Sequence, residues 1–287
     1  MNRLLEKLNP YPFERLRALI GGKPALINLS IGEPKHPTPR LIRDALAGAL
    51  DGLATYPATA GTPELRAAIS AWLGRRYGIP APDPATQVLP VNGSREALFS
   101  FAQALIDPRP GCKVVCPNPF YQIYEGAALL AGATVLYGEP ESWAGVQLLY
   151  ACSPANPSGR VMGLEDWKRL FELSDRHGFV IASDECYSEI YFDSPPLGAL
   201  EAACRLGRSD FRNLVVFSSL SKRSNAPGMR SGFVAGDAAL LKGFLLYRTY
   251  HGSAMSLAVQ AASIAAWNDE QHVRENRRLY AEKFSAV

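Results

Sequence analysis

The sequence has few cysteines and no long apolar segment. No run of about 18 uninterrupted apolar residues occurs in its 287 residues, and the start MNRLLEKLNP lacks the apolar core of a signal peptide. The cysteine count is odd and no spacing matches a zinc finger, so we expect reduced thiols and no metal site. The five cysteines are Cys112, Cys116, Cys152, Cys186 and Cys204. These absences predict a soluble protein of the cytoplasm.

The sequence also lacks an excess of either charge. Thirty basic residues stand against 27 acidic ones, the net charge is +3, and no long run carries one sign. Nothing therefore indicates binding to nucleic acid or to a membrane surface, and we expect small-molecule or protein partners. With 47% hydrophobic and 20% charged residues, the composition excludes global disorder and a coiled coil.

Short apolar runs that alternate with helical patterns dominate the rest of the sequence. Strands buried on both faces read as continuous apolar runs, and helices between them provide the crossovers of a parallel sheet. The pattern predicts an α/β fold with a mostly parallel, seven-stranded sheet covered by helices. The expected strands are residues 86–91, 113–117, 133–137, 146–152, 179–183, 213–218 and 231–236.

Several helices are also expected. Thr62 and Pro63 have the composition of an N-cap followed by a first-turn proline. The apolar residues of the helix that follows recur on one face, which predicts that it packs inward; they are Leu65, Ile69, Trp72 and Leu73. Residues 238–250, 255–268 and 272–284 also have helical patterns.

The segment SSLSKRSNAPGMRSGF, residues 218–233, contains the strongest candidate for chemistry. Lys222 follows the apolar strand NLVVF in a serine-rich turn, with Arg223 and Arg230 nearby. Most lysines are solvated surface residues, but here the cationic neighbours should lower the amine pKa and favour a neutral nucleophile. Hydroxyl groups beside arginine also predict a phosphate site.

Polar residues follow three other expected strands. Asp184 ends the strand FVIAS, where open α/β sheets place ligand-binding groups, although it could instead cap a helix. Asn156 lies between two prolines after QLLYAC. Gly93, Ser94 and Arg95 lie where a strand becomes a helix, so free backbone N–H groups and the helix dipole can hold an anion.

Together, in this order, these motifs resemble the fold-type I, pyridoxal-phosphate-dependent aminotransferases of class I and II. The resemblance extends from about Ile27 to the end of the chain. Its motifs are IGEP, TYPATAGTPELR, NGSREAL, PNPFYQIYEG, SPANPSG, SDECYSEIYFD and SLSKRSNAPGMRSGF. The fuller strings IGEPKHPTP and SSLSKRSNAPGMRSGFVAGD are most similar to the succinyldiaminopimelate aminotransferase subfamily.

The resemblance implies roles for residues around the cofactor ring. Lys222 matches the lysine that bonds the cofactor and later moves a proton at the substrate, and Asp184 matches the acid that faces the pyridine nitrogen. Tyr187 and Asn156 match the pair that hydrogen-bonds the phenolic oxygen of the ring. Tyr121 matches the aromatic residue stacked on the ring; without the motif it would be an ordinary half-buried tyrosine.

The resemblance also implies a phosphate cup, a substrate contact and a homodimer. Tyr56 matches a tyrosine that reaches the phosphate of the partner subunit, which implies shared active sites. Gly32 matches a backbone contact near the substrate α-carboxylate. The implied phosphate ligands are Ser94 and Arg95, through backbone amides, and Ser219 and Arg230, through side chains.

The expected domains are an N-terminal segment of residues 1–40, a large cofactor-binding domain of residues 41–270 and the start of an interdomain helix at 271–287. Compared with the family, we expect two departures: a short connection 138–145, and a sequence that stops before the C-terminal small domain with its carboxylate-binding arginine. We therefore expect Leu279, Tyr280 and Phe284 to lack a covering layer.

The implied activity is transamination between N-succinyl-LL-2,6-diaminopimelate and 2-oxoglutarate in lysine biosynthesis. Two alternatives stay open. The chain could be an aminotransferase or β-lyase for another amino acid, or a non-catalytic cofactor-binding module.

Overall fold

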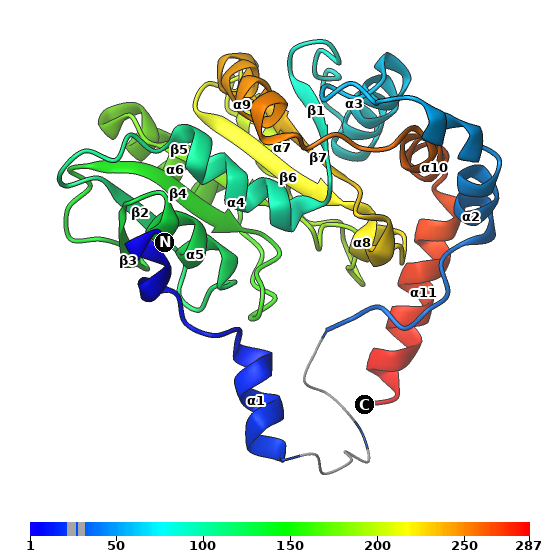
Figure 1. The fold of residues 1–287 in the computed structure, drawn as a ribbon, viewed down its shortest axis with the longest axis horizontal. Helices are drawn as coiled ribbons and strands as arrows, with labels where there is room; N and C mark the ends of the chain where they lie inside the picture. The colour runs from blue at the N-terminus through cyan, green and yellow to red at the C-terminus, as the bar shows by residue number, and fades with distance from the viewer. Residues whose placement is uncertain (22–26, 28–31) are drawn as a thin grey trace.

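A single seven-stranded sheet forms the centre of the molecule (Figure 1). The computed structural model describes residues 1–21, 27 and 32–287, so part of the expected N-terminal segment 1–40, including Ile31 of the IGEP motif, lies outside the described residues. All seven expected strands are present. They are β1 (Val88–Val91), β2 (Lys113–Cys116), β3 (Thr134–Tyr137), β4 (Val146–Cys152), β5 (Val180–Asp184), β6 (Leu214–Ser219) and β7 (Gly232–Gly236).

The sheet is mostly parallel, as the sequence predicts. Its strand order is β1-β7-β6-β5-β4-β2-β3, and only β7 runs antiparallel to its neighbours, β1 and β6. The parallel pairing aligns Asp184 of β5 with Phe217 of β6. The carboxyl ends of these two central strands therefore lie at the same edge of the sheet.

Helices cover both faces of the sheet. The helices are α1 (Pro12–Ile20), α2 (Arg40–Ala47), α3 (Pro63–Tyr77), α4 (Ser94–Leu105), α5 (Ile123–Leu130), α6 (Leu164–His177), α7 (Ala199–Arg205), α8 (Leu220–Arg223), α9 (Ala238–His251), α10 (Leu257–Asn268) and α11 (Gln271–Ser285), with 3₁₀ helices η1 (Arg3–Lys7), η2 (Leu50–Ala54) and η3 (Pro227–Met229). Residues of α3, α6, α7 and α10 share one core cluster, and residues of α4, α5 and α9 share the other.

The two clusters explain the continuous apolar runs. Successive residues of a strand point to opposite faces, so in β6 Leu214 and Val216 join one cluster, whereas Val215 and Phe217 join the other. Because each face is covered by helices, every one of these positions is buried and apolar.

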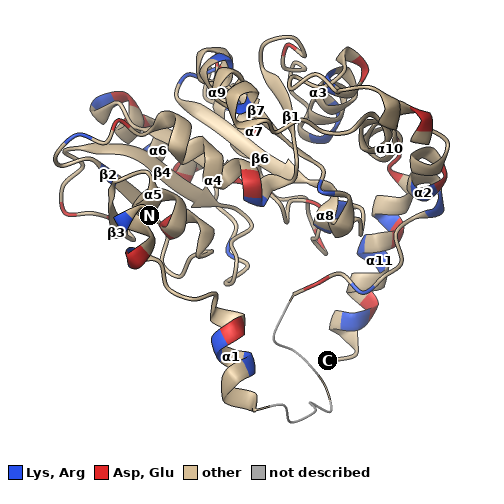
Figure 2. Ribbon diagram, in the orientation of Figure 1, with Lys and Arg blue, Asp and Glu red and all other residues tan. Residues whose placement is uncertain are grey.

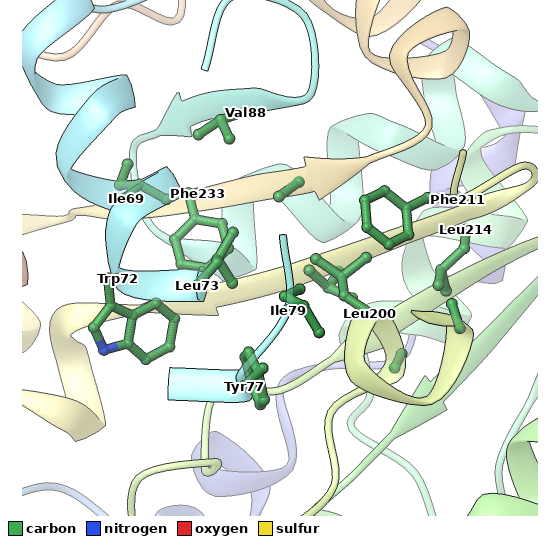
Figure 3. Packing of buried hydrophobic residues seen from close by; sticks show 14 of the residues in the cluster. Ile69, Trp72, Leu73, Tyr77, Ile79, Val88, Leu200, Phe211, Leu214 and Phe233 are labelled. Carbon is green, nitrogen blue, oxygen red and sulfur yellow. The ribbon is translucent and has the colours of Figure 1, made fainter. Parts of the chain in front are cut away.

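Helix α3 anchors one core cluster. Thr62 accepts a hydrogen bond from the backbone N–H of Leu65, which confirms the expected N-cap. In Figure 3, Trp72 of α3 lies against Phe233 of β7, and the two ring centroids are 5.9 Å apart. The face predicted from the sequence is the one that packs on the sheet, since its four apolar residues are all buried.

Helix α11 extends away from the sheet and carries alternating charges (Figure 2). The expectation that its apolar residues lack cover is correct only in part. Phe284 is 65% exposed and contacts the ring of Phe192, whereas Leu279 and Tyr280 are half-buried. The ring of Tyr280 packs edge-on against His36, with the ring centroids 5.2 Å apart. The segment that begins at residue 32 therefore covers part of the apolar face of α11.

Two expectations about the chain as a whole can be compared with the structure. All five cysteines are free, and three of them are buried. Within the described part of the chain, every helix is too short or too polar to cross a membrane.

Candidate active site

The two principal candidate residues come from adjacent strands of the sheet. Asp184 is the last residue of β5, and Lys222 lies on the short helix α8, which begins directly after β6. Because β5 and β6 are parallel neighbours, both residues emerge at the carboxyl edge of the sheet. This is the arrangement that the sequence predicts.

Asp184 is a buried carboxylate with two hydrogen-bond donors. The Tyr124 hydroxyl donates to Oδ2 at 2.6 Å, and the backbone N–H of Cys186 donates to Oδ1 at 3.2 Å. Burial raises the pKa of Asp184, and hydrogen bonding by Tyr124 and Cys186 opposes that rise. The helix-cap alternative is wrong, because Asp184 closes a turn and the next helix begins only at Ala199.

Lys222 is half-buried, and its amine points toward other candidate residues. Nζ donates to the backbone oxygen of Gly32 and lies 5.8 Å from the ring centroid of Tyr187. Burial lowers the pKa of Lys222, which favours the neutral amine. The structure thus brings together three residues expected at the site.

The direction of that shift agrees with the sequence analysis, but its expected cause was wrong. Arg223 donates to Glu270 at 2.7 Å, so its charge is neutralised by a partner. Arg230 donates to the backbone oxygen of Pro227 at 2.9 Å. Desolvation, rather than a field from these arginines, is the main cause of the lowered pKa of Lys222.

A second part of the site lies at the start of helix α4. Gly93 precedes this helix with a φ of 87°, which glycine adopts without strain. The guanidinium of Arg230 approaches so closely that a Cβ on Gly93 would lie 2.3 Å from Nη2. The helix terminus and this arginine therefore form one cationic cradle suited to an anion.

Cys186 connects the cradle to the buried acid. Its thiol donates to the Ser94 hydroxyl at 2.9 Å, and the Ser219 hydroxyl lies 3.8 Å from its sulfur. Its backbone N–H contacts Asp184. Burial and the nearby carboxylate of Asp184 raise the pKa of the Cys186 thiol, so it stays protonated.

Arg95 and Tyr121 interact at the rim of the site. Arg95 Nε donates to the Tyr121 hydroxyl at 2.7 Å, and Nη2 donates to the Tyr11 hydroxyl at 2.9 Å. The side chain of Arg95 is therefore engaged away from the cradle, which leaves its backbone N–H at the first turn of α4.

The remaining expected residues are less closely joined to this cluster. Asn156 is half-buried and lines an open pocket with Tyr187, and its backbone N–H contacts the sulfur of Cys152 at 3.4 Å. Tyr56 is fully exposed and lies outside the cluster in the single chain. Its expected contact is with a partner subunit.

Sequence reasoning gave no functional role to Tyr124 or Cys186. Cys186 is named there only as one of five cysteines expected to be reduced. A usable signal was spacing: Tyr124 follows Tyr121 by three residues in a segment that becomes helical, and Cys186 lies between Asp184 and Tyr187.

Several known proteins resemble this chain in sequence and fold. A crystal structure of an aminotransferase from Neisseria meningitidis is 56% identical and superimposes with a TM-score of 0.94, covering 99% of this chain and 78% of that one. The 4-dedimethylamino-4-oxo-anhydrotetracycline transaminase OxyQ of Streptomyces rimosus is 39% identical, over 89% of this chain and 70% of its own. An LL-diaminopimelate aminotransferase of Dehalococcoides mccartyi is 33% identical, over 95% and 74%.

A family model gives the same result over most of the sequence. Residues 24–286 match the model for aminotransferases of class I and II. The sheet and its covering helices match the fold of the Neisseria enzyme. The chain therefore belongs to the class I and II aminotransferases, has their fold-type I architecture and shares their dependence on pyridoxal phosphate.

Proposed function

We propose that this chain catalyses amino-group transfer between N-succinyl-LL-2,6-diaminopimelate and 2-oxoglutarate, with Lys222 and Asp184 acting on the cofactor. The observation that supports these roles is the emergence of a buried acid and a half-buried amine at adjacent ends of two parallel strands. The family supports transamination in general; the substrate and the residue roles are the proposal.

The described residues fit pyridoxal phosphate. The cradle of Gly93, Ser94 and Arg230 offers backbone donors, a hydroxyl and a guanidinium to a phosphate group. Because Gly93 has no Cβ, the backbone at the start of α4 and the Arg230 guanidinium can approach the same anion. Asp184 offers a buried carboxylate to a protonated ring nitrogen, and Lys222 offers an amine.

When bound, pyridoxal phosphate supplies an electron-withdrawing ring that stabilises negative charge at the substrate α-carbon. Asp184 favours a proton on the ring nitrogen, because a buried carboxylate attracts a cation strongly in a low-dielectric site. Lys222 Nζ removes the proton from the substrate α-carbon and carries it to the carbon of the cofactor that receives the amino group, and its lowered pKa favours the neutral amine that can act as a base. Such proton transfer contributes about 10²–10⁴-fold in rate.

Three other residues are proposed to orient or cover the ring. Tyr187 lies beside the Lys222 amine and shares a pocket with Asn156, so both can donate hydrogen bonds to the phenolic oxygen. Tyr121 presents an aromatic face near Arg95 and is proposed to stack on the ring.

The substrate proposal has weaker support than the reaction. The IGEPKHPTP and SSLSKRSNAPGMRSGFVAGD strings favour the succinylated compound through resemblance, and the Dehalococcoides relative is named for LL-diaminopimelate. The Streptomyces relative, named for a tetracycline intermediate, is more similar, which favours a second candidate: transamination of another amine. Comparing kcat/KM on the succinylated compound, aspartate and acetylornithine aldehyde decides between them. A preference for either competitor contradicts the subfamily assignment.

The reaction class has a direct spectroscopic test. We expect the visible absorption of the purified protein to shift when glutamate is added, because the cofactor changes during amino-group transfer. Release of ammonia and a keto acid would instead indicate a β-lyase. No spectral change and no product would indicate a cofactor-binding module without catalysis.

A homodimer with shared sites is also part of the proposal. Tyr56 and the neighbouring Leu50 and Leu53 of η2 are all exposed in the single chain, so they are available to a partner. We propose that Tyr56 donates to the phosphate bound by the partner subunit, and that the dimer is cytoplasmic. Sedimentation of the holoenzyme tests the assembly.

A further inference from the structure

Tyr124 contacts Asp184 from the helix layer beneath the site. Its hydroxyl reaches Oδ2 of the carboxylate at 2.6 Å from the first turn of α5, and its side chain is fully buried. The backbone N–H of Cys186 donates to the other carboxylate oxygen at the longer distance of 3.2 Å, and the Cys186 thiol lies near the same acid. Tyr124 therefore makes the shorter of the two hydrogen bonds measured here to the acid proposed to act on the cofactor.

The surroundings of Asp184 make that contact energetically important. Asp184 is buried, and no cationic side chain of the described chain pairs with it. A buried carboxylate without a partner cation depends on hydrogen bonds to stay ionised. Burial and the negative charge of Asp184 raise the pKa of the Tyr124 phenol, so Tyr124 stays protonated and acts as a donor.

Packing leaves Tyr124 little freedom to move. Its ring stacks on Tyr150 of β4, with centroids 4.6 Å apart and planes 12° from parallel. It also meets Tyr121 edge-on at 5.7 Å. The same side chain thus contacts the buried acid through its hydroxyl and the proposed ring-stacking residue through its edge.

We propose that Tyr124 is a positioning residue, which fixes one carboxylate oxygen of Asp184, keeps that acid ionised and holds Tyr121 at the angle needed to cover the cofactor ring. This inference rests on the proposed function, because it assigns Asp184 to the ring nitrogen. Tyr124 itself touches neither substrate nor cofactor in this proposal.

The test compares Tyr124→Phe with Tyr150→Phe. Tyr150 is a matched control, since it is equally buried, belongs to the same ring stack and donates to the backbone oxygen of Leu98 at 2.7 Å rather than to a carboxylate. The carboxyl pKa of Asp184 is measured in the cofactor-free proteins by carbon NMR, with Asp184→Asn to assign the signal. Dissociation constants for pyridoxal phosphate and for inorganic phosphate are measured alongside.

We expect Y124F to raise the carboxyl pKa of Asp184 by about one to two units, the usual effect of losing a hydrogen bond to a charged group. Y150F should leave it unchanged. Y124F should weaken pyridoxal phosphate binding by about tenfold and leave phosphate binding unchanged, because the cradle is intact. Equal carboxyl pKa values in the two variants, or an equal loss of affinity for both ligands, would overturn the proposal.

Two further results keep the inference separate from folding and from the proposed function. If Y124F does not fold, the hydroxyl protons of the wild-type protein are observed by NMR instead. A slowly exchanging tyrosine hydroxyl proton that disappears in Asp184→Asn supports the hydrogen bond from Tyr124 to Asp184. If the wild-type protein shows no such proton, the proposal is overturned. If the wild-type protein binds no pyridoxal phosphate, the proposed function fails. The carboxyl pKa of Asp184, measured in the wild-type protein and in Y124F, still shows whether Tyr124 keeps that acid ionised.

Discussion

Lys222 and Arg223 are neighbouring cations on helix α8 with opposite surroundings. Lys222 is half-buried, and its amine donates to one backbone oxygen, that of Gly32. Arg223 is 1% exposed and lies between the rings of Trp72 and Trp267, at 5.4 and 4.8 Å from their centroids. It also donates to Glu270 and to backbone oxygens of the α10–α11 corner.

The difference shows that two adjacent residues of one helix can have separate tasks: Arg223 stabilises the fold, and Lys222 is available for the proposed reaction. Arg223 makes many contacts, so its charge is committed to holding α8 against α10 and α11. The side chain of Asn276 adds to this anchor by donating to the backbone oxygens of Lys222 and Arg223 at 3.0 and 3.3 Å. The backbone of Lys222 is held in place, while its amine makes a single hydrogen bond in the described structure, which suits the proton transfer proposed for it.

The largest effect should come from replacing Lys222. Lys222→Ala should lower the rate by at least about 10²–10⁴-fold, the usual contribution of a positioned base, and prevent covalent attachment of the cofactor. The free energy of unfolding should change little, because the amine makes one hydrogen bond within the described part of the chain. Borohydride reduction and peptide mapping of the wild-type protein should place the label on Lys222. A label on Lys242 would contradict the assignment.

Asp184→Asn should have the next largest effect on rate. It keeps the shape of the side chain and removes its charge, so we expect a decrease of about 10²–10³-fold in kcat. Wild-type kinetics in Asp184→Asn would show that the carboxylate does not act on the cofactor.

We also expect the difference in unfolding free energy between Asp184→Asn and the wild-type protein to depend on pH. Burial raises the pKa of Asp184 in the folded state, so ionisation disfavours folding. This cost is absent below the unfolded pKa of about 3.9 and develops as the pH rises through the folded pKa. Asn cannot ionise, so the cofactor-free variant should gain stability relative to wild type between pH 4 and pH 7. Urea unfolding at both values measures this, and the opposite trend would refute it.

Arg223→Met should mainly affect stability. Removing one partner of a buried ion pair costs about 3–5 kcal/mol, and the lower value is expected because the Glu270 side chain is 35% exposed and can be hydrated. Covalent loading of Lys222 should stay complete below the melting temperature. Arg75→Met is the control, since Arg75 is exposed and donates only to the Trp267 backbone oxygen in the described structure. Equal unfolding free energies for both variants would contradict the comparison.

The smallest effect is expected at the proposed subunit boundary. Tyr56→Phe should weaken pyridoxal phosphate binding by about tenfold, the lower end of the range for a hydrogen bond to a charged group. Tyr250→Phe is the control, because Tyr250 is 89% exposed and has no proposed role. If both variants bind the cofactor like wild type, Tyr56 does not reach the partner's phosphate.

The strands could be predicted from the sequence because a strand that is buried on both faces is a continuous run of apolar residues. The sequence also placed Asp184 and Lys222 at the carboxyl ends of two such strands, because each follows an apolar run directly, and the structure has them there. The antiparallel direction of β7 was not predicted, since an apolar run does not record its direction. Tyr124 was not predicted as functional, because its role depends on where α5 packs over β4 and β5.

The cause of the lowered Lys222 pKa shows a further limit. Adjacent arginines in a sequence suggest a cationic field, but the field depends on where their side chains point and which acids neutralise them. Glu270 is far from Arg223 in the sequence and pairs with it only through the packing of α8 against the α10–α11 corner. Tertiary partners of this kind leave no local signal.

The antiparallel strand β7 also affects which parts of the chain can change in evolution. The loop 220–231 leaves β6 and returns through β7 at the same edge, and Leu220 N–H donates to the Ser231 backbone oxygen at 3.0 Å, which closes the loop at its base. An added residue there would displace Lys222 or Arg230. The connection 138–145 joins the edge strand β3 to β4 away from this loop, so changes in length should accumulate there among descendants of the same ancestor.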